Sequence, residues 1–438
     1  MRNVFISFLG TTNYLPCNYL IKGHDPVQNI RFVQEACIAR WCTQWGADDR
    51  IFICVTDESE KNNWHDNGHK VQLQGLETRL QLLCLAAPVE KVLIPVGKKE
   101  EEIWDIFERV FSLLDEGDNL YLDITHAFRS LPMLAMVILS YAKVMRNITV
   151  RAISYGAMEA LGNLKKVENM RIEDRNVPVF DLLPFDRLQD WTTAIDRFSK
   201  TGDGKLIQHL AKQDITPILK QTKGQDRDAA ALRAFGKCLA EFSGVVTTCR
   251  GLELSAKGNA LRLSLLELGG QKMIKPLHPL LEKIEPAFSV FQGEEITDGI
   301  AAAQWCEEHK LYQQSYTILL ETMITFVVNK ALGKDGRNKD DRTLVNQCTA
   351  IIVDDKPESE WLPPASNDKS ITQQMIAWLR PQQDLLQGLR TLSDIRNDLN
   401  HAGQNDKPRK MEAVQRNLSC HLEEMKKIVA RNSNLDNR

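Results

Sequence analysis

One stretch in the first half of the chain, LYLDITHAFRSLP (120–132), carries polar side chains that suit the binding of phosphates. Its apolar run ends in Thr125, His126 and Arg129, and Ser130 precedes a second apolar run. Arg129 can hold a phosphate with its fork of N–H donors, and His126 can donate from either ring nitrogen. Ser130 resembles a helix cap with proline in the first turn, which would aim free amide groups at an anion.

A second loop, GTTNY (10–14), offers complementary chemistry. The side chains of Thr11, Thr12 and Asn13 can bond riboses and phosphates, and the ring of Tyr14 is suited to stacking on a base. The loop lacks the GxGxxG pattern, so a dinucleotide cofactor is not expected. We expect no cofactor and no metal at this site.

A third stretch, RNDLNHAG (396–403), places Arg396, Asn397 and His401 near the end of a predicted helix. An imidazole can move protons near neutral pH, an arginine can neutralise a phosphate, and an asparagine can orient either group. RNA supplies its own nucleophile, the 2′-hydroxyl. This set of side chains therefore suits the cleavage of RNA without a metal.

The spacing within this stretch restricts the geometry. At about 100° per residue, Asn397 and His401 share a helix face, whereas Arg396 and His401 lie about 140° apart. Two arrangements could still unite them: a distorted helix end, or two copies of the segment meeting across a twofold axis. Gly403 is expected to end the helix in a left-handed cap.

The elements that must position these residues differ between the two ends of the chain. Up to about residue 185, β-rich runs alternate with helical patterns, which is typical of a mostly parallel sheet covered by helices on both faces. The predicted strands are 3–10, 50–56, 91–96, 119–125 and 148–156. Ligands bind outside the carboxyl ends of such strands, so loop 10–14 and the loop after 119–125 should lie together.

After residue 185 the strand signal disappears and helical patterns take over. The sequence predicts an α/β domain followed by all-α structure: residues 1–185, a helical connector over 186–295, and a helical domain over 296–438. Within the first domain, Asp123 lies inside the strand pattern, so we expect it to orient the following loop rather than touch a ligand.

Composition sets further limits. A formal charge of −3 over 438 residues excludes a broad basic surface, so nucleic acid must be met by a local site. No run of 18 apolar residues and no signal peptide is evident, so no membrane association is expected. The ten cysteines form no CxxC pair and are typical of a reducing cytoplasm.

The run DITHAFRSLP resembles the signature of CRISPR-associated Rossmann-fold (CARF) sensor domains, and ISFLGTTNYLP resembles their first segment. Ala127 stands where that family usually has glycine. The resemblance implies a Rossmann-like domain that dimerises and binds a cyclic oligoadenylate across its twofold axis. By position, the resemblance assigns this ligand to Thr11, Thr12, Asn13, Thr125, His126, Arg129 and Ser130.

The form RNxxxH, followed by Ala-Gly in a helical terminal domain, resembles the motif of HEPN ribonucleases. In that family the dimer interface builds the active site. Every motif position is matched, which implies catalytic roles for Arg396, Asn397 and His401.

Together the two resemblances imply a CARF-HEPN effector of type III CRISPR systems. Such a protein is a homodimer or higher homo-oligomer that cleaves single-stranded RNA, leaving a 2′,3′-cyclic phosphate. Its activator would be cyclic tetra-adenylate, with cyclic hexa-adenylate as the other ring size considered. Two alternatives stay open: a ring nuclease that cuts the cyclic activator in the CARF site, and a non-catalytic regulator that binds nucleic acid.

Overall fold

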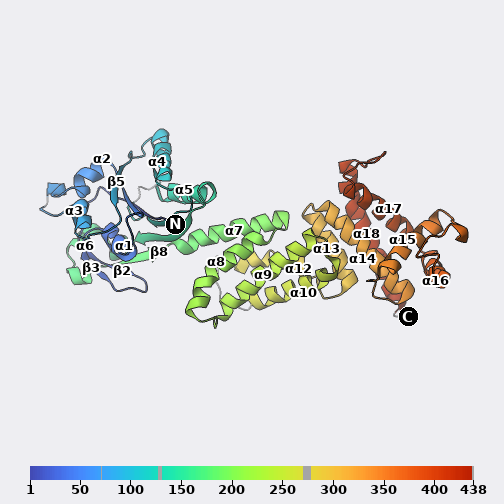
Figure 1. The fold of residues 1–438 in the computed structure, drawn as a ribbon. Helices are drawn as coiled ribbons and strands as arrows, with labels where there is room; N and C mark the ends of the chain where they lie inside the picture. Colours follow the sequence, from blue (N-terminus) through green and yellow to red (C-terminus); the bar gives the residue numbers. More distant parts are fainter. Residues whose placement is uncertain (71, 127–130, 270–277, 437–438) are drawn as a thin grey trace. The chain divides into compact units, whose positions relative to one another are not determined.

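The structure is a computed structural model that describes residues 1–70, 72–126, 131–269 and 278–436 (Figure 1). Internal contacts divide the chain into two compact units, Met1–Arg187 and Leu188–Arg438. The division of the helical part into a connector and a terminal domain stays a prediction.

Within the described residues of the first unit, eight strands form one sheet in the order β3-β2-β8-β7-β6-β1-β4-β5. The β2–β3 and β7–β8 pairs are antiparallel and the other neighbours are parallel, as expected for an α/β fold. The strands are β1 (Asn3–Phe8), β2 (Cys17–Ile21), β3 (Val27–Ile30), β4 (Arg50–Val55), β5 (Val89–Leu93), β6 (Asn119–Asp123), β7 (Thr149–Gly156) and β8 (Asn176–Asp181).

Helices cover both faces of this sheet (Figure 1). Successive residues of β1 point to opposite faces, so Phe5 joins a core with α1 (Val33–Trp41) and α3 (Leu76–Gln81). Its neighbours Val4 and Ile6 join a second core with α4 (Glu100–Ser112) and α5 (Leu131–Met145). The remaining helices of the unit are α2 (Asp57–Ser59), η1 (Glu60–Trp64), η2 (Gly68–Lys70), η3 (Met158–Leu161), α6 (Leu164–Glu168) and η4 (Ile172–Asp174).

The strand order reverses at β1, which pairs in parallel with β4 on one side and with β6 on the other. Open α/β sheets bind ligands at such a reversal, outside the carboxyl ends of the two strands. The loops that follow β1 and β6 begin at that point. Strand topology therefore supports the expectation that loop 10–14 and the loop after β6 lie together.

The sequence prediction of five strands was incomplete. It missed β2, β3 and β8, which extend the sheet on the β7 side. β3 (VQNI) is short and polar and β8 contains Pro178, so neither shows the apolar run that marks a buried strand. The predicted strand over 91–96 lies instead at Val89–Leu93.

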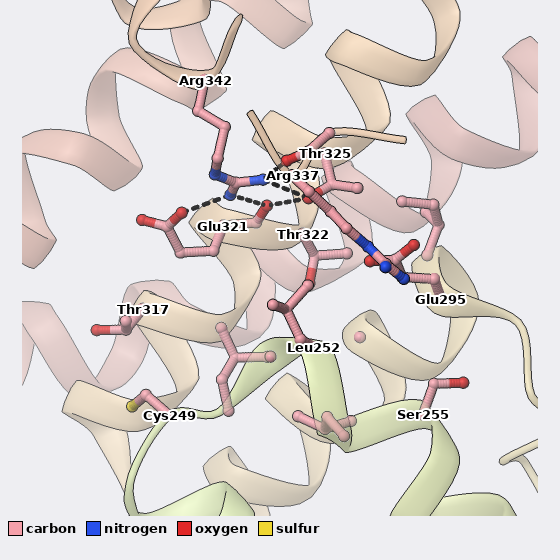
Figure 2. Close-up of a pocket in the computed structure, with 16 residues that line it drawn as sticks. Cys249, Leu252, Ser255, Glu295, Thr317, Glu321, Thr322, Thr325, Arg337 and Arg342 are labelled. Carbon is pink, nitrogen blue, oxygen red and sulfur yellow. Dashed lines mark hydrogen bonds and ion pairs between the residues drawn. The ribbon is translucent and has the colours of Figure 1, made fainter. Parts of the chain in front are cut away.

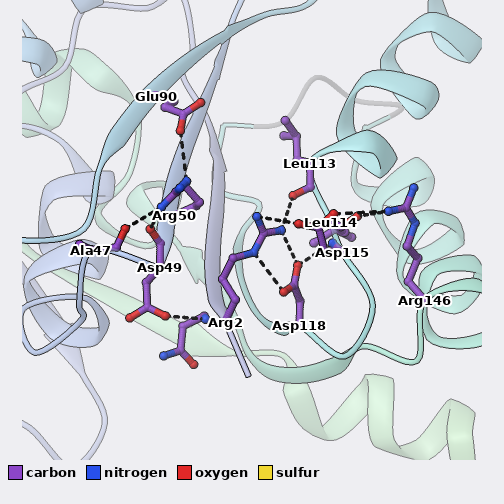
Figure 3. Close-up of polar contacts among 11 residues, drawn as sticks. Arg2, Ala47, Asp49, Arg50, Glu90, Leu113, Leu114, Asp115, Asp118 and Arg146 are labelled. Atoms are coloured by element: carbon purple, nitrogen blue, oxygen red, sulfur yellow. Dashed lines mark hydrogen bonds and ion pairs between the residues drawn. The ribbon is translucent and has the colours of Figure 1, made fainter.

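Polar contacts hold the amino ends of the strands (Figure 3). Arg2 pairs with the buried carboxylate of Asp118, with Nη2 2.6 Å from Oδ2, and donates from the same nitrogen to Leu113 O. At the edge of the sheet, two exposed residues of β5 form ion pairs: Glu90 lies 3.5 Å from Arg50 of β4, and Lys91 pairs with Glu60 of η1.

The second unit is helical throughout its described residues. One continuous apolar core extends from Trp191 to Val429, because each amphipathic helix buries its apolar face against the others. The helices are α7 (Leu183–Thr201), which begins in the first unit, α8 (Lys205–Gln221), α9 (Arg227–Thr247), α10 (Gly251–Gly269), α11 (His278–Glu282), α12 (Glu285–Phe288), α13 (Glu295–Glu308), α14 (Tyr312–Leu332), α15 (Lys339–Val353), η6 (Glu358–Glu360), α16 (Lys369–Leu379), α17 (Gln383–Asn400) and α18 (Met411–Asp436).

Helices α15 and α16 each begin after a polar loop. Asn338 caps α15 by accepting from the amides of Asp340 and Asp341, and Asp368 caps α16. Among the helices that the structure describes, none combines the length and the apolar character needed to cross a membrane.

Candidate functional site

The loop after β1 is held by hydrogen bonds from two side chains that the sequence patterns did not identify. Asn63 of η1 donates from Nδ2 to the carbonyls of Gly10 and Thr12, at 2.9 Å each. Asn62 donates to Thr11 O at 3.3 Å. The hydroxyls of Thr11 and Thr12 take no part in these contacts, so the clamp fixes the backbone and leaves the hydroxyls for a ligand.

Asn13, the third predicted ligand residue in this loop, contacts the buried side chain of Arg31. Arg31 donates to Asn13 Oδ1 at 3.4 Å, to Tyr14 O at 3.3 Å and to Gln74 O at 2.8 Å. These oxygens satisfy a guanidinium that is only 6% exposed. The amide nitrogen of Asn13 is therefore the part of its side chain that remains to donate to a ligand.

The expectation that Tyr14 could stack on a base is wrong. Its ring is 3% exposed and packs 5.0 Å from the ring of Phe32. Its hydroxyl oxygen accepts a hydrogen bond from the Gly10 amide at 2.7 Å. Tyr14 stabilises its own loop. Because its ring is buried and its hydroxyl is hydrogen-bonded, neither face of the ring is free to stack on a base.

The two predicted ligand loops lie side by side, as expected. The rings of Tyr14 and His126 meet edge to face with centroids 4.4 Å apart. A Cβ at Gly10 would come within 3.2 Å of His126 Cβ and 2.9 Å of Tyr14 Oη. Gly10 is therefore required because the loops approach so closely.

Asp123 organises the loop after β6, which confirms the expected role. Its carboxylate is fully buried and accepts from Ser7 Oγ at 2.6 Å and from the amide and hydroxyl of Thr125 at 3.1 and 2.5 Å. The Thr125 hydroxyl in turn accepts from the amide of Gly156 at 2.7 Å. Thr125 thus links β6 to β7, and its hydroxyl is already engaged as both donor and acceptor.

His126 cannot donate from both ring nitrogens at neutral pH. Burial lowers the pKa of His126 to about 4, so the imidazole is neutral and carries one N–H. It can offer one donor and one acceptor to a ligand. Burial likewise raises the pKa of the neighbouring Asp123.

Arg129 and Ser130, the other two predicted ligand residues, lie outside the described residues, as does Ala127. Helix α5 begins at Leu131, with Pro132 in its first turn. In the part of the chain that the structure describes, no three His, Cys, Asp or Glu side chains gather in a way that could hold a metal ion.

At the other end of the chain, Asn397 and His401 share one face of the α17 terminus, as their spacing predicts. The His401 amide donates to Asn397 O at 3.0 Å, and both side chains are exposed. They line a hollow of about 430 Å³ together with Asp394, Asp398, Asn405, Lys407 and Arg409.

Arg396 does not line this hollow. Its guanidinium turns toward α14, where Nη2 lies 4.0 Å from Glu321 Oε1, and its buried Nε has no hydrogen-bond partner among the described residues. Glu321 also accepts from Arg342 Nη2 at 2.5 Å (Figure 2). A single chain therefore separates the arginine and the imidazole, as the 140° offset requires.

Helix α17 ends in a Schellman motif, in which the left-handed conformation expected at Gly403 begins one residue earlier. The Gly403 amide donates to Asp398 O at 2.9 Å, and the Ala402 amide donates to Leu399 O at 3.1 Å. Ala402, with φ 54°, occupies the position expected for glycine, and Gly403 follows with φ 70°.

A second cavity, of about 400 Å³, lies beside Glu321 between α10, α13, α14 and the loop before α15 (Figure 2). Arg342 forms part of its wall and also donates to Thr325 Oγ1 at 2.8 Å and to Gly336 O at 2.7 Å. The sequence patterns did not predict this cavity.

No protein-family model matches the chain. Over 234 residues the chain is 26% identical to the CRISPR-associated protein MJ1674 of Methanocaldococcus jannaschii. The aligned part covers 53% of this chain and 33% of that protein. The chain thus resembles a CRISPR-associated protein across about a third of that relative's length.

Proposed function

We propose that this chain is a CRISPR-associated endoribonuclease that cleaves single-stranded RNA when a cyclic oligoadenylate binds. The similarity to a CRISPR-associated protein supports the biological setting. The observation that carries the chemistry is the pair of exposed side chains, Asn397 and His401, lining one hollow while Arg396 faces another direction. This division fits a catalytic site that two copies of the chain complete together.

The chemistry follows from these groups. The imidazole of His401 removes the proton from a 2′-hydroxyl, whose oxygen attacks the adjacent phosphorus. The bond from phosphorus to the 5′ oxygen breaks, and an imidazolium returns a proton to that oxygen. Arg396 stabilises the charge on the phosphoryl oxygens and Asn397 orients the reacting groups. The products are a 2′,3′-cyclic phosphate and a 5′-hydroxyl.

The activator site in this proposal is the pair of loops at the reversal of strand order. Hydroxyls of Thr11 and Thr12, the Asn13 amide and neutral His126 suit the riboses and phosphates of cyclic tetra-adenylate, or of the hexa-adenylate ring. Arg129 and Ser130 complete this set by the sequence resemblance.

An exposed apolar face on α5 supports twofold pairing of the first unit. Met133 is 79% and Val144 82% exposed, and Val137, Tyr141 and Met145 continue the same stripe at helical spacing. Contiguous apolar surface of this kind is typical of an interaction site. We propose that a second copy of the chain covers it.

His401→Ala tests the catalytic role. A fluorescent RNA reporter is incubated with the full chain and cyclic tri-, tetra- or hexa-adenylate in parallel. We expect one ring size to activate the wild type, and His401→Ala to abolish cleavage while still binding the ring. RNA cleavage by His401→Ala at the normal rate would overturn the assignment.

Arg129→Ala serves as the matched variant for the activator site. It should raise the activator concentration required for cleavage while the basal rate persists. The alternative ring-nuclease activity is tested by following the cyclic compound itself in the His401→Ala sample. If the ring is opened there, the first unit acts as a ring nuclease.

A further inference from the structure

The hollow beside His401 contains two cationic side chains that no motif assigns, Lys407 and Arg409. Both are exposed, and their backbone amides are used in local hydrogen bonds. In the described part of the chain, neither side chain is paired with a carboxylate, whereas many other cations of this unit are.

Asp398 builds the loop that presents these cations. One carboxylate oxygen accepts from Asn405 Nδ2, and the other accepts from the Arg409 amide at 3.3 Å. Asn405 Oδ1 in turn accepts from the Lys407 amide at 2.9 Å. The loop after α17 is thereby folded back onto the helix end, so that both cations line the same hollow as His401.

The chain needs such a local site. With a net charge of −3 it has no general attraction for a polyanion, so the affinity for RNA must come from a few cations near the reacting phosphate. Lys407 and Arg409 are two positions apart around Pro408, whose ring restricts the backbone. Residues two positions apart lie at most about 7 Å from each other, so the two side chains can contact neighbouring phosphates.

We propose that Lys407 and Arg409 bind the RNA phosphates next to the scissile bond, and that Asp398 positions them. This inference rests on the proposed ribonuclease function and adds its substrate-binding residues. Asp394, the other carboxylate of the hollow, has no such structural role in the described contacts and only opposes a phosphate by its charge.

The two carboxylates make opposite predictions. Asp394→Asn removes a repelling charge and should lower the KM for RNA. Asp398→Ala also removes a negative charge, yet it should raise the KM, because the loop that carries the two cations is released. A simple effect of net charge would move both variants in the same direction.

The binding test uses full-length protein activated by the cyclic oligoadenylate that works for the wild type. Lys407→Gln and Arg409→Gln should each reduce the slope of log affinity against log salt by about 0.7, which is about fivefold in affinity at 0.1 M salt. Lys212→Gln, at an exposed position on α8, controls for the loss of one charge.

The outcomes separate the two levels of the proposal. If the wild type cleaves no RNA with any cyclic oligoadenylate, the proposed function fails. If the wild type cleaves RNA but Lys407→Gln and Arg409→Gln match Lys212→Gln in KM and salt slope, the phosphate subsite is wrong and the function stands. Anisotropy with labelled RNA in the His401→Ala background checks affinity without turnover.

Discussion

At the scale of single residues, the loops after β1 and β6 contain two kinds of polar side chain. Some form hydrogen bonds that build the loops, and others remain available to bind a ligand. Tyr14 and Thr125 carry polar groups that suit a ligand, but both use their hydroxyls within the chain. In Thr11 and Thr12, by contrast, the backbone carbonyls accept the hydrogen bonds, and the side-chain hydroxyls take no part in them. Sequence alone could not make this distinction, since the partners Asn62 and Asn63 lie about fifty positions away.

The burial of His126 predicts a specific dependence of stability on pH. Its pKa is about 4 in the folded chain and about 6.5 when unfolded, so the unfolded state binds more protons between these values. The His126 contribution to stability is complete above pH 6.5 and is lost as the pH falls toward 4. The loss can reach about 1.4 kcal/mol per pH unit.

This prediction is checked by thermal unfolding of the full chain at several pH values, comparing the wild type with His126→Gln. The difference between them should change across pH 4 to 6.5. The raised pKa of Asp123 acts in the opposite sense, because its protonation favours the folded state, but it is present in both proteins. A difference that does not vary with pH would contradict the assignment.

At the scale of elements, the short helix η1 is the support of the first loop. Its sequence, EKNNW, has no strong helical pattern, and its side chains bond backward to a loop about fifty residues earlier. The strands β1, β4, β6 and β7 could be predicted because apolar β-branched and aromatic runs identify them. β2, β3, β8 and η1 could not, because tertiary pairing, rather than local pattern, stabilises them.

Asn63→Ala should weaken activator binding and lower stability by about 1–3 kcal/mol, because two carbonyl partners lose their donor. Asn62→Ala removes a single, longer hydrogen bond and serves as the matched control with a smaller effect. Titration of the cyclic oligoadenylate by calorimetry measures the affinity. Equal behaviour of the two variants would show that the clamp does not shape the site.

The second site illustrates what helical spacing can predict. Positions 397 and 401 were expected on one face and line one hollow, while Arg396 was expected apart and contacts Glu321. The partners Lys407 and Arg409 were not predicted, because a loop carries them and Asp398 folds it back. Helical spacing predicted how side chains are arranged along α17. It could not predict which side chains the following loop places beside the helix.

At the scale of the whole molecule, the proposal depends on two copies meeting. Substitutions in the exposed apolar stripe of α5 test this dependence. They leave the residues of the proposed activator and catalytic sites unchanged. Val137→Lys combined with Val144→Lys places charges on exposed positions, so the fold should persist while the proposed dimer dissociates. RNA cleavage should then fall to background at protein concentrations where the wild type is dimeric.

Light scattering coupled to size exclusion measures the oligomeric state, and the melting temperature verifies the fold. Leu164→Lys, at a 46% exposed position on α6, is the control and should leave both mass and cleavage unchanged. A double variant that remains dimeric and active would remove α5 from the interface.

The charged edge of the sheet restricts how copies can associate. β5 exposes the charged side chains of Glu90 and Lys91, which pair with Arg50 and Glu60, so an incoming strand would have to lie beside two charged residues. Charges at such an edge discourage open-ended strand addition, and fibrils should not grow from this side of the sheet even in concentrated protein.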